Sequence, residues 1–441
     1  MKLRTALSAV ASTAAAALLL TGCAGGGGSL QSGGGDSASG WNKPTQSLKG
    51  VTLTYGGGTT VDAGIKEVQA AFAKATGVKW KKVVYPDPYE QTLLTKVAAG
   101  DKPDLAGWQP TTSELTPLQP TKNLLPMTGA PWLSKVDAST RDVAGFYDKT
   151  RYAAIVTSPS VIGVYYNKQV FEKYGITSTP KSFDEMLADA KKIKAAGGTA
   201  FEEAVGDQWP TQWTVQVQLA EAAKDGLWGR LNTNKEQFTS PTILNAIKQY
   251  KSMVDDGLYN RDIKTTTFVQ QSDALLKGKA AMAIQVNALV LQMQQTASTE
   301  QIDNAIGWFP ISKSGNVAMN IPDNKNGVVA FKTGDAKREA ASKQFLNYWM
   351  TTGYKGYVDA LKTVSIEPGV PTPEGVPEVV QTIAKSVGGS AGSMQSDALA
   401  NPDLYINLAN MVQGTQTPEQ VAETTQKQFV GFAQAQGAKG F

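Results

Sequence analysis

Hydrophobic and polar positions in the first quarter of the chain follow strand and helix periods in turn. A β-rich run at 51–55 stops at three glycines, and apolar residues then recur at helical spacing over 65–75. Short strands are expected at 83–85 and 105–108. The helix between them, 87–99, opens with an acid, a proline and a glutamate, which together form a capping signal. This order predicts a mainly parallel sheet covered by helices, and so an α/β fold.

A second α/β unit begins after Ser158-Pro159 with the apolar strand 161–166. The apolar stripes of the helices that follow are expected to face a core. No repeat of fixed period is visible. These helices are predicted at 182–196, 240–256, 335–352 and 417–432.

The N-terminus has the pattern of a targeting segment. Lys2 and Arg4 precede the apolar run 6–20, which is too short to span a membrane but is typical of a signal peptide, here 1–22. The run Leu20-Thr21-Gly22-Cys23 resembles the lipobox of bacterial lipoproteins, and this resemblance implies that Cys23 is acylated and becomes the mature N-terminus. An ordinary signal peptide with an incidental cysteine is the alternative.

The segment 23–48 would be the lipidated cysteine and a flexible linker, because Gly and Ser dominate it up to Gly40. We therefore expect an extracytoplasmic body anchored to the outer face of the bacterial cell membrane, with the lipid as its only anchor.

Composition excludes several kinds of chemistry. The 42 basic and 38 acidic side chains give a net charge of +4 without a long basic block, so nucleic acid is a poor partner. With no His, imidazole cannot serve as metal ligand, general base or triad member. With one Cys, no disulfide can form within the chain. We expect neither a cofactor nor a metal, and only carboxylate chemistry, or none, remains.

Three runs in the middle of the chain resemble the central signature of the extracellular solute-binding proteins of ABC importers. They are Gly163–Lys168, Phe171–Ile176 and Pro180–Glu185. The carbohydrate-binding group, typified by maltose-binding protein, is the most similar. Further pieces follow the order of that family, namely 100–104, 278–282, 306–310 and 414–420.

The resemblance implies a two-lobe periplasmic-binding-protein (Venus-flytrap) fold with a hinge of three crossings. One lobe would hold 49–157 plus 308–332, and the other 160–306 plus 335–441. The crossings would lie near 158–159, Gly307 and 332–334. The implied function is that of a monomer, not an enzyme, which captures a sugar, expected to be an oligosaccharide, in the interlobe cleft by hinge closure. It would then deliver the sugar to the permease subunits of the importer.

A sugar has an apolar C–H face and a rim of hydroxyls, so its site should combine aromatic platforms with amides and carboxylates. Trp108-Gln109 follows the strand 105–108, where the family places a stacking tryptophan, and ordinary packing is the alternative for Trp108. Gln208, Trp209 and Trp213 also suit a sugar platform, although at least one of these two indoles should fill the core.

Other candidates lie at loops. Thr59, Thr60 and Asp62 follow the glycine elbow at 56–58, and a phosphate cradle there is discounted because the lysine and spacing of a P-loop are missing. Asn287 lacks the neighbouring tryptophan of several sugar binders, which weakens any expectation of maltose-like specificity. The remaining candidates are Asp323 and Asn324, which a solvated turn would equally explain, and, more weakly, Ser365 and Glu367.

Two other function classes stay open. A lipid-anchored glycoside hydrolase needs two carboxyl groups facing each other across a cleft. The pairs Glu202-Glu203 and Asp255-Asp256 are adjacent, so their side chains diverge, and we expect both to be solvated. A binder of a polyamine or another charged nutrient would need a cleft rich in carboxylates, which the indoles near Trp108 and Trp209 disfavour.

Overall fold

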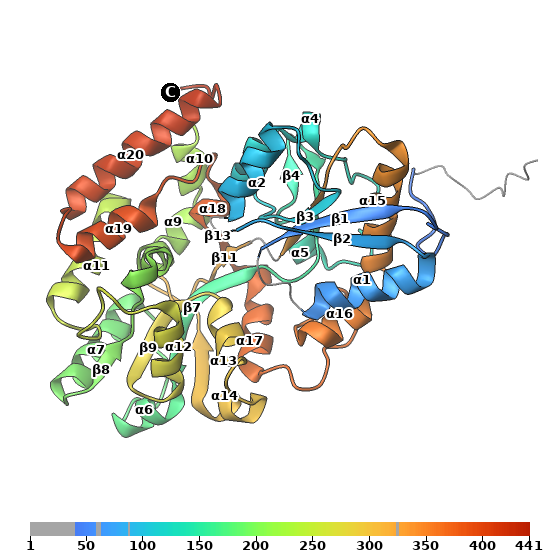
Figure 1. The fold of residues 1–441 in the computed structure, drawn as a ribbon. Coiled ribbons are helices and arrows are strands. Elements are labelled where there is room, and N and C mark those ends of the chain that lie inside the picture. The colour runs from blue at the N-terminus through green and yellow to red at the C-terminus, as the bar shows by residue number, and fades with distance from the viewer. Residues whose placement is uncertain (1–39, 59–62, 87–88, 323–325) are drawn as a thin grey trace, which may run out of the picture. The chain divides into compact units, whose positions relative to one another are not determined.

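The structure is a computed structural model that describes residues 40–58, 63–86, 89–322 and 326–441. From residue 39 to the C-terminus the chain forms one compact unit. Its two main sheets are mixed (Figure 1). The first has the strand order β2 (Lys79–Val84), β1 (Thr52–Gly57), β3 (Leu105–Gly107), β12 (Gly327–Ala330), β6 (Ala153–Ile155). The second has the order β13 (Ala391–Gly392), β11 (Met319–Ile321), β7 (Ser160–Asn167), β9 (Ala280–Gln285), β8 (Thr199–Phe201), with β10 (Ile306–Phe309) also paired to β7.

The first sheet is covered on both faces, and we call it and its helices the first lobe. Successive residues of β12 enter different cores, as Val328 packs with one helix group and Val329 with the other. The first group is α1 (Ala63–Thr76), α15 (Ala336–Trp349) and α16 (Tyr354–Leu361), and the second is α2 (Tyr89–Ala98) and α3 (Thr112–Leu115). Shorter elements of this lobe are α4 (Pro120–Asn123), α5 (Ala138–Arg141) and the hairpin β4 (Phe146–Tyr147) and β5 (Thr150–Arg151).

The second sheet and its helices form the second lobe, which has two cores. None of the helices in the described ranges is long and apolar enough to cross a membrane. The larger core includes α6 (Lys168–Lys173), α7 (Phe183–Ala195), α8 (Trp213–Gln218), α9 (Ala220–Lys224), α10 (Leu227–Leu231), α11 (Pro241–Asp255), α18 (Met394–Asp397), α19 (Leu404–Gln413) and α20 (Pro418–Ala435). The smaller includes α12 (Phe268–Leu276), α13 (Ala288–Met293), α14 (Thr299–Ala305) and α17 (Glu378–Ser386).

Helix starts with a capping signal agree well with the sequence. The Ser182 hydroxyl accepts from the Glu185 backbone N–H at 3.2 Å, and Thr417 and Gln420 form a reciprocal capping box. The prediction of a mainly parallel sheet is only half right. Strands β1, β2 and β3 are parallel, but β12 runs antiparallel to β3 and to β6 because it returns from the second lobe. Strand β2 begins four residues before its predicted start, since its exposed lysines hide the apolar pattern.

The predicted lobe boundaries differ from the observed pairing in two places. Strands β10 and β11 pair with β7, so residues 306–321 belong to the second lobe. Helices α15 and α16 pack into the first lobe's core, although 335–441 was predicted to lie entirely in the second lobe. The core and strand assignments therefore change lobe between Val156 and Val161, between Ile321 and Gly327, and between Ile366 and Val379. Sequence pattern alone carries no information on which sheet a short strand joins.

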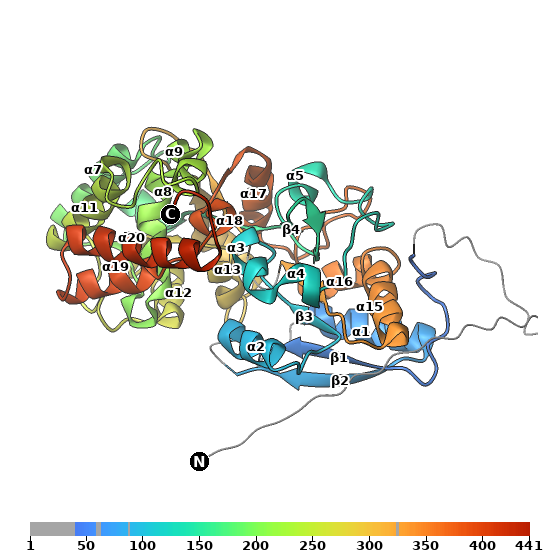
Figure 2. The same cartoon turned by 90° about the horizontal axis from the view of Figure 1, so that it is seen from above.

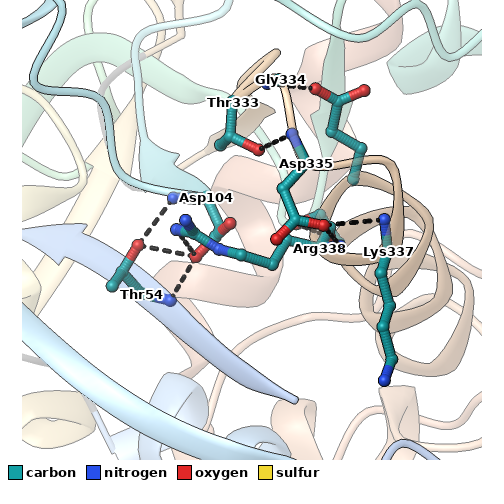
Figure 3. Close-up of polar contacts among 9 residues, drawn as sticks. Thr54, Asp104, Thr333, Gly334, Asp335, Lys337 and Arg338 are labelled. Carbon is teal, nitrogen blue, oxygen red and sulfur yellow. Dashed lines mark hydrogen bonds and ion pairs between the residues drawn. The ribbon is translucent and has the colours of Figure 1, made fainter.

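A buried carboxylate ties the first sheet to α15 (Figure 3). Asp104 has no exposed surface, and its Oδ2 accepts from the Thr54 backbone N–H at 2.6 Å, from the Thr54 hydroxyl at 2.7 Å and from Arg338 Nη2 at 2.7 Å. Asp335 caps α15 through the backbone N–H groups of Lys337 and Arg338. The carboxylate thus joins β1, the start of β3 and the first turn of α15.

We predict that Asp104→Ala lowers the free energy of unfolding by about 2–4 kcal/mol, because it removes three charge-assisted hydrogen bonds from a buried position. The matched control is Asp101→Ala, which breaks an exposed pair with Lys96 at 3.6 Å and should cost less than about 0.5 kcal/mol. Urea unfolding measures both. Equal stability of the two variants would contradict the role of Asp104.

Candidate ligand-binding site

The carboxyl ends of β1 and β3 hold two helices of the first lobe in place. The Tyr89 hydroxyl at the start of α2 donates to the Gly107 carbonyl at 2.6 Å, which fixes α2 against the end of β3. Trp108 donates from its indole Nε1 to the Glu114 carbonyl at 2.8 Å and so holds the short helix α3. Both helices therefore start at the edge of the sheet where open α/β folds bind ligands.

Trp108 itself is not a stacking platform in this structure. It has no exposed surface and packs in a core with Tyr89, Leu115 and Phe331. The prediction that a ligand stacks on Trp108 is therefore wrong for this conformation. The residue follows the strand as expected, but its ring turns into its own lobe. Trp108 positions Glu114 instead of presenting a face.

Helix α3 contacts the second lobe directly. Thr111 caps it by accepting from the Glu114 backbone N–H, and the Ser113 hydroxyl donates to the backbone carbonyl of Gln395 on α18 at 2.9 Å. Figure 2 shows α3 and α18 side by side. The contact joins residues 282 positions apart in the sequence, so the site is assembled from both lobes.

Glu114 faces a residue of the second lobe, because its side chain forms a hydrogen bond with Asn401. Burial and the nearby charge of Glu90 raise the pKa of Glu114 to about 7, against the weaker opposing effect of that hydrogen bond. The Oδ1 atom of Asn401 is buried without a hydrogen-bond partner. A carboxyl group that titrates near neutrality thus stands beside an amide oxygen whose hydrogen-bonding capacity is unused.

Tyr405 on α19 completes this group. Burial, followed by the charges of Asp403, Glu90 and Glu114, raises its pKa. The backbone carbonyl of Tyr405 accepts from the Thr211 hydroxyl at 2.9 Å, which fixes α19 to the 3₁₀ turn Trp209–Gln212. We call Glu90, Ser113, Glu114, Gln395, Asn401 and Tyr405 the interlobe polar cluster.

The two indoles at 209 and 213 take different roles, as the sequence suggested for at least one of them. Trp213 is 4% exposed and lies in the main core, whereas Trp209 is half-buried at its margin. The Trp209 ring packs against Phe268 with centroids 4.9 Å apart and against Trp213 at 6.1 Å. The partly exposed indole of Trp209 therefore remains on the turn to which α19 is hydrogen-bonded.

Gln208, also predicted for the site, is exposed and has φ 61° and ψ −55°. This conformation is costly for a residue with a side chain, and such strain concentrates at functional positions. Two 3₁₀ turns enforce it, since Gln208 ends Val205–Asp207 and its carbonyl accepts from the Thr211 backbone N–H at 3.0 Å. The backbone thus holds Gln208 in a strained conformation directly before Trp209.

Three buried amides support the second-lobe side of the cluster. Gln216 donates to Gln395 at 2.9 Å, and Gln395 donates to Gln212 at 2.5 Å. The Gln216 side-chain oxygen accepts from the Met394 backbone N–H at 3.0 Å, which is at the start of α18. A satisfied network of this kind holds α18 in the position where the backbone carbonyl of Gln395 accepts the hydrogen bond from Ser113 on α3.

The remaining predicted residues are dispersed. Gln109 is half-buried just after β3. Asn287 uses its side-chain oxygen to accept from the Val161 backbone N–H at 3.0 Å, so it secures the start of β7. Glu367 is buried near Ser365 in the first lobe, and burial raises its pKa to about 7. Cys23, Thr59, Thr60, Asp62, Asp323 and Asn324 lie outside the described residues.

The paired carboxylates behave in opposite ways. Asp255 and Asp256 are exposed, as predicted. Glu202 and Glu203 are 8% and 2% exposed, so the expectation that they are solvated is wrong. They leave the end of β8 toward the core, where Glu203 meets the Tyr250 hydroxyl at 3.5 Å, and burial raises the pKa of each to about 7.

Two surface pockets lie elsewhere. One of about 400 Å3 lies between α7 and α11 and is lined by residues such as Asp184 and Gln249. The other, of about 490 Å3, lies beside Thr52, Lys81 and Lys337. Neither lining includes an aromatic side chain, so neither has the apolar platform that a sugar ring needs.

Sequence reasoning predicted none of the six residues of the interlobe polar cluster for the site. Glu114 stands three residues after Thr111, a capping spacing directly after β3, and this signal was available. No local sequence pattern distinguishes Asn401, Tyr405 and Gln395 from other polar residues. Only the folded arrangement brings them to α3.

Comparisons of sequence identify the family. The profile of the bacterial extracellular solute-binding proteins matches residues 56–356. A binding protein of Brucella abortus (strain 2308) is 27% identical over 306 residues, 62% of this chain and 66% of that protein, so the chain spans just under two thirds of the relative's length. An ABC transporter extracellular-binding protein of Pyrococcus horikoshii is 28% identical over 122 residues, 27% of each chain.

Solved structures share the fold. A chitin oligosaccharide binding protein superposes with a TM-score of 0.73 at 21% identity, over 86% of this chain and 98% of that one. RafE in complex with raffinose gives 0.70 at 20% identity over 86% and 98%, and apo RafE from Streptococcus pneumoniae gives 0.68 at 20% identity over 86% and 97%. These similarities agree with the two-lobe fold that the sequence predicted. Together with the profile match, they lead to one identification: the chain belongs to the family of bacterial extracellular solute-binding proteins.

Proposed function

We propose that this protein is the substrate-binding lipoprotein of an ABC importer and that it captures an oligosaccharide between its lobes. The observation that carries the proposal is the interlobe polar cluster, whose Tyr405 is bound to the turn that holds the half-buried Trp209. Family membership supports the binding role, and the structural similarity to a chitin oligosaccharide binding protein and to RafE in complex with raffinose supports a sugar.

The chemistry of the cluster suits hydroxyl groups. The Tyr405 hydroxyl can donate and accept, and Asn401 has a buried oxygen without a partner. The face of Trp209 would meet the C–H face of a sugar ring. Each neutral hydrogen bond contributes only about 0.5–1.5 kcal/mol, so several must act together for micromolar affinity, about −8 kcal/mol.

Capture would work by a shift of conformation. A ligand that touches both α3 and α19 gains its full set of contacts only when the lobes approach each other, so binding favours the closed state by that difference in affinity. The closed form would dock on the permease subunits and release the sugar chemically unchanged. We propose a monomer without catalytic activity, because the function needs only these two states.

A second candidate ligand is a cation such as a polyamine. The observation that favours it is the gathering of Glu90, Glu114 and Asp403 around Tyr405, which is richer in carboxylates than the sequence suggested. Against this, the pKa of Glu114 near 7 leaves that group partly neutral at physiological pH. We therefore place the sugar first.

We predict that a thermal-shift screen of mono- and oligosaccharides, with spermidine included, identifies a sugar ligand. At a hundred times its dissociation constant the ligand stabilises the native state by about 2.7 kcal/mol. Chromatography of the incubated sugar should recover it intact, whereas product formation would indicate a glycoside hydrolase. Stabilisation by spermidine alone would favour the cationic ligand.

Substitutions then locate the site in the same assay. Trp209→Ala should weaken binding of the identified sugar at least tenfold, about 1.4 kcal/mol, because the stacking face is lost. Trp209→Phe should retain part of the affinity. The matched control is Trp213→Phe, which alters the neighbouring buried indole and should change stability more than affinity. Unchanged affinity in Trp209→Ala would remove Trp209 from the site.

The raised pKa of Glu114 predicts a pH-dependent stability. The folded pKa of about 7 exceeds the ordinary value of 4.5, so this group's stabilising contribution is complete below pH 4.5 and is lost as the pH rises through 7. Glu114→Gln should therefore gain about 1–3 kcal/mol relative to the wild type between pH 4.5 and pH 8. Urea unfolding at both pH values measures this gain. Exposed Glu374→Gln is the control, and an equal gain there would contradict the assignment.

The lipid anchor gives a separate prediction. A bacterium fed an alkyne-tagged fatty acid should label the wild-type chain, and Cys23→Ala should abolish the label and release the protein from the membrane fraction. No other cysteine can take the acyl group, because the chain contains only one. Release of the wild-type protein without label would contradict the anchor and leave the ligand proposal intact.

A further inference from the structure

The amino end of the first sheet carries a group of exposed lysines that plays no part in the proposed ligand site. We call this group the basic edge. Strand β2 is an outer strand of the sheet, and neighbouring segments add to it. The members are Lys49 before β1, Lys74 in the last turn of α1, and Lys79, Lys81 and Lys82 on β2.

The backbone brings these lysines together. A Cβ on Gly77 would lie 3.0 Å from the Lys49 Cγ, so the Lys49 side chain runs over the turn between α1 and β2. In the parallel pairing, Lys79 lies opposite Thr52 and Lys81 opposite Thr54. Because side chains alternate along a strand, Lys79 and Lys81 extend from one face of the sheet and Lys82 from the other, so the three lysines surround the outer edge of β2.

Charge is concentrated here. Residues 41–86 contain seven lysines and two acidic residues, a net charge of +5, whereas the whole chain has a net charge of only +4. Within the described ranges, no member of the basic edge forms an ion pair with a carboxylate. Their positive charge is therefore not neutralised by direct ion pairs, and the nearest carboxylate in the pocket beside Lys81 is Asp335.

Lysines on an edge strand also discourage pairing between sheets of different molecules. That explanation covers β2 but not Lys49 or Lys74, which lie off the strand. Lys337 and Arg338 line the 490 Å3 pocket that they share with Lys81, where three basic side chains face one carboxylate, Asp335. The surface is thus broader than protection of one strand requires.

The location of the basic edge relates it to the proposed tether. The first described residues run along α15, where Asn347 Nδ2 donates to the Asn42 carbonyl at 2.9 Å and Gln344 Nε2 donates to the Gln46 carbonyl at 2.7 Å. The chain then reaches Lys49 and β1. The segment that would lead to the membrane therefore enters the body on the same lobe, a few residues before the basic edge.

We propose that the basic edge rests on the anionic lipid surface of the membrane that bears the anchor. Lysines near such a surface are attracted by its negative potential within about one Debye length, about 8 Å at physiological salt. The parallel strands β1, β2 and β3 place the interlobe polar cluster at their other, carboxyl end. The body can thus lie on the lipid without covering the ligand site.

The test uses residues 24–441 without lipid, since the body from residue 39 on is one compact unit with its own cores. Co-sedimentation compares vesicles of 30% phosphatidylglycerol in phosphatidylcholine with pure phosphatidylcholine vesicles. Binding is expected to the anionic vesicles only. The triple variant K79Q/K81Q/K82Q should reduce the partition coefficient by about tenfold or more, and 0.5 M NaCl should abolish binding.

The matched control is K191Q/K192Q/K194Q on α7, which removes the same charge from exposed lysines of the second lobe. There Lys194 donates to the Asp256 carbonyl, and Asp189 lies near Lys192. This variant should bind anionic vesicles as the wild type does. An equal loss in both variants would show that only net charge matters and would overturn the proposal.

Two further results would also overturn it. One is equal partitioning into both kinds of vesicle, or into neither. The other is binding to neutral vesicles that occurs only when the vesicles carry membrane proteins and that is lost in K79Q/K81Q/K82Q. This result would assign the basic edge to a protein partner. The vesicle assay involves neither sugar nor acyl chain, so its outcome is separate from that of the proposed function.

Discussion

Strand β12 is the constraint on which the arrangement of the lobes depends. It fills the gap between β3 and β6, and without it both strands would expose unpaired backbone groups inside the first lobe. Its first residue has no room for a side chain, because a Cβ on Gly327 would lie 2.6 Å from the Trp108 carbonyl oxygen and 2.8 Å from Pro110. Only glycine lets the returning strand approach β3 this closely.

The return of β12 forces the chain to pass between lobes more than once, and side chains join the passages to each other. Asn326 donates to the Ser158 carbonyl at 2.8 Å, which links the passage before β12 to the one before β7. Asn287 secures the next residues by accepting from Val161. A motion that brings α3 toward or away from α19 would be concentrated in such short segments, since the sheets on either side are continuous and packed.

Prediction from sequence succeeded where local chemistry decides the outcome. The strands 51–55 and 161–166 and the capped helices appear as expected, because capping and periodicity act over a few residues. Prediction failed where contacts between distant segments decide the environment of a side chain. Trp108 sits at the expected strand end, but Leu115 and Phe331 enclose its ring. Glu114 was not predicted for the site, because its neighbour Asn401 lies 287 positions later in the sequence. No pattern within one segment encodes such pairs.

The parallel strands of the first lobe separate two kinds of electrostatic surface. Their amino ends carry Lys49 and Lys79, while their carboxyl ends lead to Glu90 and Glu114. A body that rests on its basic end would keep its acidic, partly buried end away from an anionic lipid surface, where like-charge repulsion is least, until the closed form docks on the permease. The same topology that gathers polar groups for a ligand would therefore also orient the site. Orientation and recognition need no shared residue, because a parallel sheet has two chemically independent ends.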